Sequence, residues 1–301
     1  MRKLPSWDDH RVFLAVIETG SLAGAARHLG LSHPTVRQRI EALEARIGTP
    51  LFTRSGTGLT ATAQALALAA PARSMAFAAE LFGRIASAPA SEAGGIVRLS
   101  VSEYMGIEVV PPVLARLRQH HPALTVELVL SNARSDLLGQ EVDVALRHIA
   151  PVQEALVAQR LLPIPLGLFA ARAYLDRRGQ PATIRDLVHH DVIGPDRNTG
   201  DARIAEMLMP GHRPADLALR TDSHPAQAAA ARAGLGIVVM QVPVGEADPR
   251  LVRVLPDLQV AELPLFVVTH ENLRAVPRVR AVFEALVKEL GRKAEQATPF
   301  R

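Results

Sequence analysis

Residues 21–48 read SLAGAARHLGLSHPTVRQRIEALEARIG, and this stretch predicts two short helices with almost no loop between them. Ser21 and Ser32 are residue types that cap helix N-termini, and Pro34 fits a first helical turn because its missing N–H has no partner there. A glycine ends each helix. Two helices joined this tightly must cross steeply, so the stretch predicts a helix-turn-helix. The buried stripe expected on the second helix is Val36, Ile40, Leu43 and Ile47.

A further helix and a hairpin flank this stretch. The helix is predicted to begin at Ser6, where Asp9 three positions later completes a capping box, and to end at Gly20. After the helix-turn-helix, residues 54–58 are glycine-rich and carry a basic residue, which predicts a hairpin. Residues 6–60 therefore predict a compact head of three helices and a hairpin.

The second helix of a helix-turn-helix fits the major groove of DNA, where side chains near its N-terminus contact base edges. Arg37 suits the paired acceptors of guanine, Gln38 suits adenine, and Pro34 suits a thymine methyl group. Neighbouring hydroxyls and Arg54 are better placed for phosphate, which fixes the register. The predicted DNA-binding residues are Ser21, Ser32, His33, Pro34, Thr35, Arg37, Gln38, Arg39 and Arg54.

Positive charge is concentrated in the head. Residues 1–60 hold eight Lys and Arg against five Asp and Glu, a net of +3, while the whole chain carries +4. The remaining 241 residues (301 − 60) are close to neutral. For an arbitrary polar triplet such as Arg37-Gln38-Arg39, a solvated helix face is the simpler interpretation. Charge gathered in one small head instead indicates a polyanionic partner, double-stranded DNA.

A spaced set of residues runs from Phe13 to Thr60, namely Phe13-Leu14-Ala15-Val16, Glu18-Thr19-Gly20-Ser21, Ala25-Ala26, Leu31-Ser32, Pro34, Val36, Ile40, Leu43-Glu44, Ile47-Gly48, Pro50-Leu51-Phe52, Arg54 and Leu59-Thr60. In this set the head resembles the LysR-type transcriptional regulators. The resemblance implies a winged helix-turn-helix that binds DNA as a homodimer or homotetramer. The family usually has Gln at the position of His33, and Ser then Arg at those of Arg37 and Gln38. The docking mode therefore carries over, and the base preference does not.

Composition bounds the class of protein. The length of 301 residues favours about two domains. The absence of cysteine excludes disulfide scaffolds, thiolate nucleophiles and thiol-based redox sensing. No apolar run approaches the roughly 20 residues that span a bilayer, and residues 1–9 turn acidic where a signal peptide turns apolar. We therefore expect a cytoplasmic protein without a membrane partner, and no cofactor, metal site or catalytic residue is predicted.

A long alanine-rich helix is predicted from residue 60 or 62 to about residue 87, with a kink at Pro71. Its narrow apolar stripe is Leu66, Ala70, Phe77, Leu81 and Ile85. With nothing local to bury this stripe, we expect it to pair with a helix of another chain, as the resemblance also implies. The alternative is an ordinary packed helix of a larger domain.

A small-residue linker with Pro and paired Gly occupies residues 88–95 and marks a boundary. The predicted domains are a winged helix-turn-helix DNA-binding domain (1–59), a linker and dimerisation helix (60–90) and an effector-binding domain (91–301).

Alternating strands and helices follow the linker, which predicts a largely parallel sheet covered by helices, an α/β fold. The strands are predicted at 96–101, 124–130, 142–146, 166–169, 192–193, 236–240 and 265–268, and the helices at 107–119, 135–139, 171–178, 184–187, 225–233 and 277–290. The order gives two lobes joined by two crossings, lobe I (91–162 and 266–301) and lobe II (163–265).

This part also resembles the LysR-type family, through looser matches at Leu117, His121-Pro122, Val142-Asp143-Val144-Ala145, Ala233-Gly234-Leu235-Gly236-Ile237, Pro264-Leu265, His270, Leu273-Arg274, Pro277 and Val279. The resemblance implies an effector domain of periplasmic-binding-protein-like architecture.

Ligands of open α/β sheets bind outside the carboxyl ends of the strands. The strand ends give the predicted effector-binding residues Ser102, Glu103, Tyr104, Ser131, Asn132, Arg147, Gly194, Asp222, Ser223 and His270. Helix N-termini after some of these turns favour a small anion, so a carboxylate metabolite is the default small-molecule effector. Glu103 opposes an anion unless it is protonated or paired. For each residue, a turn or cap role is the alternative.

Two other function classes remain. An enzyme would draw on Asp222-Ser223-His224, His189-His190-Asp191 or His120-His121, but adjacent residues do not assemble a catalytic triad and no nucleophile or metal motif is present. An architectural protein that coats DNA without sequence choice would need broad phosphate neutralisation, which the near-neutral last 241 residues do not provide. A sequence-specific regulator controlled by an effector between the lobes is the leading hypothesis.

Overall fold

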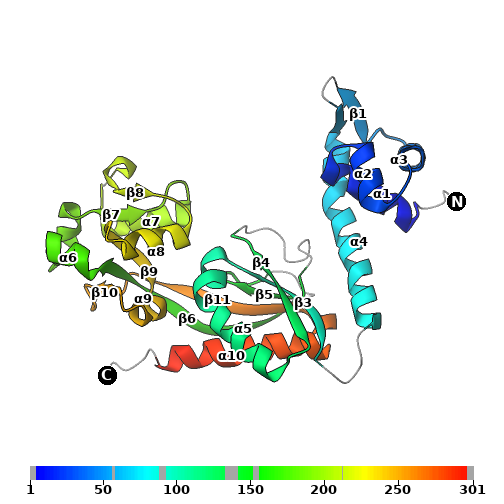
Figure 1. The fold of residues 1–301 in the computed structure, drawn as a ribbon. Coiled ribbons are helices and arrows are strands. Elements are labelled where there is room, and N and C mark those ends of the chain that lie inside the picture. The colour runs from blue at the N-terminus through cyan, green and yellow to red at the C-terminus, as the bar shows by residue number, and fades with distance from the viewer. Residues whose placement is uncertain are drawn as a thin grey trace. The chain divides into compact units, whose positions relative to one another are not determined.

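The computed structural model describes residues 5–55, 58–87, 93–132, 142–151, 156–211 and 213–296. The described residues fall into two compact units, the first ending at residue 87 and the second beginning at residue 93. Figure 1 shows the head and its long helix in blue and cyan, and the second unit in green to red.

The first unit contains the predicted three helices, hairpin and long helix. Its elements are α1 (Trp7–Thr19), α2 (Leu22–Leu29), α3 (His33–Ile47), β1 (Phe52–Ser55), β2 (Gly58–Ala61) and α4 (Ala63–Ser87). The predicted caps are confirmed, since the side chains of Ser6, Ser21 and Ser32 accept hydrogen bonds from N–H groups three residues later. The three helices end at Gly20, Gly30 and Gly48, all in the left-handed conformation that glycine adopts without strain.

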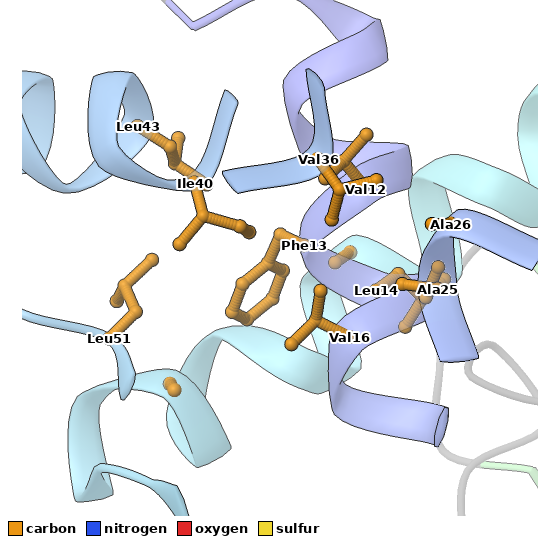
Figure 2. Packing of buried hydrophobic residues seen from close by; sticks show 13 residues of the cluster. Val12, Phe13, Leu14, Val16, Ala25, Ala26, Val36, Ile40, Leu43 and Leu51 are labelled. Atoms are coloured by element: carbon orange, nitrogen blue, oxygen red, sulfur yellow. The ribbon is translucent and has the colours of Figure 1, made fainter. Parts of the chain in front are cut away.

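The core of the head is built around Phe13 of α1. Figure 2 shows its ring amid Val36 and Ile40 of α3, Val16 of its own helix and Leu51. These side chains are almost fully buried. The helical spacing of the apolar residues therefore places one face of α3 inward and leaves the opposite face to solvent.

The long helix α4 has two different apolar faces. Ala65, Ala69 and Ala72 are buried against the core of the head, a packing that the sequence analysis did not separate from the predicted stripe. Of that stripe, Leu66 and Ala70 are exposed, Leu66 at 62%. The side chains of Phe77, Leu81 and Ile85 lie outside the described residues. Pro71 lies inside the helix as predicted.

The second unit is a mixed sheet with the strand order β4-β3-β5-β11-β6-β9-β7-β8, and with β10 paired to β6. Its strands are β3 (Gly95–Val101), β4 (Leu124–Leu130), β5 (Val144–Arg147), β6 (Leu156–Ala171), β7 (Val192–Gly194), β8 (Leu219–Arg220), β9 (Ile237–Gln241), β10 (Leu251–Val254) and β11 (Ala261–His270). The outer pairs are parallel, as predicted. The prediction is wrong in the middle, where β11 and β6 pair antiparallel with each other and with their other neighbours.

The helices of this unit are α5 (Pro111–His120), α6 (Arg172–Arg178), α7 (Thr199–Leu208), α8 (His224–Arg232), α9 (Val242–Ala247) and α10 (Pro277–Gln296). The predicted helix at 107–119 is divided into a π-helical turn, Met105–Val109, and α5, because Pro111 and Pro112 mark a new helix start. The sequence analysis missed α7, α9, β8 and β10. The predicted helix at 135–139 lies outside the described residues.

The strands β6 and β11 connect the two halves of this unit. Their ladder runs from the pair His270 and Leu156 at one end to the pair Ala261 and Leu166 at the other. The register shifts between Leu263 and Leu265. We call the part that holds β3, β4, β5, α5 and α10 lobe I, and the part that holds α6 to α9 with β7 to β10 lobe II. In Figure 1 these groups lie toward opposite ends of the two long strands.

One buried carboxylate, that of Asp9, ties α1 to α3 in the head. It accepts a hydrogen bond from the N–H of Ser6 at 3.0 Å, pairs with Arg46 at 2.6 Å, and lies 3.6 Å from Arg39. Burial acts to raise the pKa of Asp9, but the hydrogen bonds from Ser6 and the charge of Arg46 outweigh it and hold the pKa below its usual value. The charged form is therefore the one that the fold stabilises.

Asp9→Asn should lower the free energy of unfolding of the head by about 2 kcal/mol at pH 7, because it removes a charge-assisted contact. Since the pKa of the folded state lies below the ordinary 3.8, this stabilisation is present above pH 3.8 and is lost as the pH falls below it. Denaturant unfolding followed by the fluorescence of Trp7, the single tryptophan, measures it.

Asp8→Asn is the matched control, because the Asp8 side chain is 57% exposed and should contribute little. Equal losses in the two variants, or a gap between wild type and Asp9→Asn that persists in acid, would contradict the role of Asp9.

Candidate functional site

The exposed face of α3 holds most of the residues predicted to contact DNA. His33, Pro34, Arg37 and Gln38 are exposed, while Val36 is fully buried beneath them. The helix is therefore anchored on one side and presents a polar N-terminal half on the other, which is the arrangement that base reading requires.

The hydroxyl residues at the helix starts have cap roles. Ser21 accepts from the N–H of Gly24 at 3.0 Å, and Ser32 accepts from that of Thr35 at 3.2 Å. The Oγ of Ser32 also lies 2.7 Å from Oγ1 of Thr35. These contacts hold the start of α3 and do not themselves test phosphate binding.

The arginines of α3 differ in how firmly the head holds them. Arg37 lies 3.9 Å from Glu41 one turn later and is 44% exposed, a weak surface pair that leaves it available. Arg39 is less exposed and lies 3.4 Å from Asp8 and 3.6 Å from Asp9, so it helps to hold α1 on α3. The backbone of Arg54 lies in β1 of the hairpin, and its side chain lies outside the described residues.

One contact that the sequence analysis missed fixes the hairpin to α3. Oε1 of Glu44 accepts hydrogen bonds from the N–H groups of Leu51 at 2.7 Å and Phe52 at 3.1 Å. The carboxylate therefore pairs two backbone N–H groups at the point where the chain that leaves α3 enters the hairpin. The wing is held against the recognition helix by this interaction.

In the second unit, some of the predicted effector residues converge from both lobes. Glu103 follows β3 in lobe I, and its N–H donates to Oδ1 of Asn132 at 3.0 Å. Ser223, at the start of α8 in lobe II, donates to Oε2 of Glu103 at 3.2 Å. The next residue of each lobe continues the contact, because the rings of Tyr104 and His224 lie 6.4 Å apart in an edge-on arrangement.

Other predicted effector residues have structural partners. Both terminal nitrogens of Arg147 donate to Ser100. Asp222 accepts from the N–H groups of residues 196–198, and His270 caps a turn by accepting from the N–H of Asn272. Gly194 lies where a Cβ would come within 2.8 Å of Leu217, so it is a packing position.

Two further predicted residues, Ser102 and Ser131, lie at the ends of β3 and β4. The N–H of Ser131 donates to the carbonyl of Val101, and Ser102 is half-buried and accepts through its carbonyl from Gly106. Their backbone bonds shape the loops after β3 and β4.

The electrostatics do not favour the default carboxylate effector. The backbone N–H groups of residues 196–198, a ready anion site, are already occupied by Asp222. Those at the start of α7 are capped by Asn198. Glu103, by contrast, has no cationic partner within salt-bridge distance among the described residues, so an anion at this point meets a half-buried negative charge.

Two partly buried histidines near this point were not among the predicted effector residues. His224 lies 2.9 Å from Asp201, which raises the pKa of His224 against the opposing effect of burial. His148 lies 2.9 Å from the carbonyl of Pro264, and burial lowers its pKa. The two histidines are close enough for their charges to interact.

The enzyme alternative finds no assembled triad in the described residues. In the candidate Asp222-Ser223-His224, Ser223 donates to Glu103, His224 pairs with Asp201, and Asp222 binds backbone. Tyr174 lies 3.3 Å from His190 and accepts from the N–H of Asp191, which is a structural arrangement. No group of three His, Cys, Asp or Glu suited to a metal ion occurs in the described part of the chain.

Two family models match the chain. "Bacterial regulatory helix-turn-helix protein, lysR family" matches residues 7–66, and "LysR substrate binding domain" matches residues 90–291. The chain belongs to the LysR family, which confirms the resemblance found in its sequence.

The curated relatives are named as transcription regulators, not as enzymes. An HTH-type transcriptional regulator of Xanthomonas campestris pv. campestris (strain 8004) is 31% identical over 195 residues, 64% of this chain and 56% of the relative. The HTH-type transcriptional activator AaeR of Escherichia coli (strain K12) is 28% identical over 179 residues, 60% of this chain and 58% of AaeR. The matches thus span less than two thirds of these relatives.

Solved structures share the fold. CbnR, a LysR family transcriptional regulator, has a TM-score of 0.68 at 20% identity and covers 95% of this chain and 99% of its own. The structure of full-length CbnR complexed with its target DNA has a TM-score of 0.67 at 22% identity. The match covers 96% of this chain and 100% of CbnR. The virulence activator AphB of Vibrio cholerae has a TM-score of 0.60 at 21% identity, and the match covers 95% of this chain and 99% of AphB. The predicted fold class is confirmed.

Within the described ranges, every helix is too short or too polar to cross a bilayer.

The two tyrosines of the chain allow a test of the buried contact between the lobes. Tyr104 is 6% exposed and its hydroxyl has no hydrogen-bond partner among the described residues, so Tyr104→Phe should raise the free energy of unfolding by about 1 kcal/mol. Tyr174 is fully buried with a bonded hydroxyl, so Tyr174→Phe should lower it by about 1 kcal/mol.

Urea unfolding of the full chain, followed by circular dichroism, measures both changes. A loss of stability in Tyr104→Phe as large as that in Tyr174→Phe would show that the hydroxyl of Tyr104 is satisfied in solution.

Proposed function

We propose that this chain is a sequence-specific DNA-binding transcription regulator of the LysR type, controlled by a small-molecule effector that binds between two α/β lobes. The observation that carries the proposal is the exposed half of α3, where Arg37 and Gln38 project from a helix whose other face is buried. Family membership supports it, as does the shared fold with CbnR, whose structure was solved with target DNA. We place the protein in the cytoplasm, with its DNA.

Base reading would be divided among the residues of α3. Arg37 and Gln38 carry the donors for base edges, and Pro34 is exposed at the N-terminal end for an apolar contact. His33 lies beside them. Ser21, Ser32, Thr35 and Arg54 are proposed to contact phosphate, and Arg39 contributes mainly by holding α3 against α1.

The effector would bind where the lobes meet. Glu103, Tyr104 and Ser223 are the residues that we propose to contact it directly, because they reach this point from both lobes. Ser102, Ser131 and Asn132 shape the loops on the lobe I side. We propose that Arg147, Gly194, Asp222 and His270 each support their own strand end or turn through the contacts described above, without touching the ligand.

Effector binding would change the angle between the lobes and, through α4, the spacing of two recognition helices on half-sites of DNA. We propose that two or four chains pair through α4. This helix exposes Leu66, Met75 and Phe82, with exposed fractions of 62%, 41% and 75%. Apolar side chains this exposed on a long helix favour a partner helix.

Replacing Arg37 and Gln38 with alanine should weaken binding to the specific site by about 10- to 100-fold while changing binding to random DNA far less. Arg11→Ala is the matched control, because it removes an equal charge from an exposed residue of α1. Fluorescence anisotropy with the chain's own upstream intergenic DNA and with a scrambled duplex, at one salt concentration, measures the ratio.

Equal losses on both duplexes would remove the base-reading role. A wild-type ratio near one would favour an architectural DNA-coating protein instead.

Phe82→Glu should shift the chain toward the monomer in sedimentation velocity, because it places a charge in the proposed helix pair. Val188→Glu, at a 48% exposed residue outside α4, should leave the oligomer unchanged. A wild-type chain that sediments as a monomer at micromolar concentration would refute pairing.

A further inference from the structure

A short segment of lobe I, residues 103–108, makes repeated contacts with lobe II. Tyr104 is buried in a cluster of lobe II side chains that includes Phe169, Ile193 and Met240. Two residues from this segment and two from lobe II add polar contacts: Ser223 donates to Glu103, and the side-chain amide of Gln241 lies 3.3 Å from Sδ of Met105. The segment therefore enters lobe II as a continuous strip.

The last contact of the strip is an ion pair with near-ideal geometry. The two terminal nitrogens of Arg232, at the end of α8, donate to the two carboxylate oxygens of Glu108 at 2.8 Å each. The Nε of Arg232 donates to Asp248 at 2.7 Å, and Asp248 is in turn bound by Arg250 at 2.8 Å. Each of the three guanidinium nitrogens therefore donates to a carboxylate, and two of them bind Glu108 side by side as a bidentate pair.

The pair is largely shielded from water and divides cleanly between the lobes. Arg232 and Glu108 are 15% and 17% exposed, and Asp248 is 8% exposed. Within lobe II, Arg232 keeps Asp248 as a partner whatever lobe I does. Glu108, in contrast, has no other cation within salt-bridge distance among the described residues. Its charge is therefore paired only while lobe I lies against α8.

Such a contact is sensitive to small movements. Two parallel hydrogen bonds on a rigid fork are lost together when the partner shifts by an ångström or two, and separation leaves a carboxylate that must be rehydrated. Glu108 lies within a π-helical turn, Met105–Val109, a local distortion of the kind that often occurs at functional sites. The same turn connects it to Glu103 and Tyr104.

We propose that the Glu108–Arg232 pair is a latch between the lobes, and that Arg232 is the positioning residue that sets the lobe angle of the chain when no effector is bound. Movement of Glu103 or Tyr104 by a ligand is transmitted along the π-helical turn to Glu108 and opens the latch. The latch rests on the contacts above, and its regulatory consequence rests on the proposed function.

The absence of cysteine makes the lobe angle directly measurable. Gln119→Cys in lobe I and Gln180→Cys in lobe II, both at exposed positions, introduce two unique sites for nitroxide labels in the full chain. Electron–electron double resonance on labelled chains mixed with an excess of unlabelled chains reports the distance within one chain. Glu108→Gln should lengthen this distance and make its distribution about twofold wider.

Two further variants distinguish loss of the latch from a general loss of stability in the second unit. Glu289→Gln removes an ion pair of equal length, Arg116–Glu289 at 2.8 Å, that lies within lobe I, and should leave the distribution unchanged. Glu108→Asp keeps the charge on a shorter arm and should give an intermediate distribution, which also decides the question if Glu108→Gln does not fold. An unchanged distribution in the Glu108 variants, or the same widening in Glu289→Gln, overturns the latch.

Binding of the same labelled chains to upstream and scrambled DNA keeps the two proposals apart. Loss of sequence preference in the wild type refutes the proposed function, and the distance result still decides the latch. If both stand, Glu108→Gln should change affinity for the specific site by about 5-fold or more without effector.

Discussion

The antiparallel pairing of β6 and β11 is the constraint on which the second unit depends. Both lobes are built on these two strands, which stay hydrogen-bonded from His270 and Leu156 to Ala261 and Leu166. Their ladder is interrupted between Leu263 and Leu265, where Pro163 and Pro264 have no N–H to donate. Because a strand bends at a bulge, the lobe movement that we propose would act on the ladder at this place. His148 binds the carbonyl of Pro264 and holds the bulge from the side of lobe I.

The head could be predicted almost completely because its signals are local. A serine cap acts on an N–H three residues later, and a left-handed glycine ends a helix by itself, so Ser32 and Gly48 define α3 without reference to the rest of the chain. The exposed face then follows from the spacing of Val36, Ile40 and Leu43. The spacing of apolar residues did not predict the second, buried face of α4. That face consists of alanines at 65, 69 and 72, which are too weakly hydrophobic to form a recognisable pattern in an alanine-rich segment.

The second unit could be predicted only in part, because its decisive contacts are distant in sequence. The strand pattern located β3, β4 and β9, and it located parts of β6 and β11 at residues 166–169 and 265–268. It did not show that β6 and β11 are long and antiparallel, since pairing direction is not encoded in a run of apolar residues. Of the ten predicted effector residues, the structure joins Glu103, Asn132 and Ser223, and it gives Arg147, Asp222 and His270 other partners. Glu108 and Arg232 are 124 residues apart, so no local pattern links them.

Asp9 in the head and Arg232 in the second unit show how one kind of interaction serves opposite purposes. Each is a largely buried charge held by partners from separate elements. Buried ion pairs add little net stability over apolar packing, but they are intolerant of altered geometry. Asp9 lies inside one packed core, so that intolerance keeps α3 rigid on α1, as a base-reading helix requires. Arg232 lies at the boundary between the lobes, so in the proposed latch the same intolerance makes its pair with Glu108 either fully formed or broken.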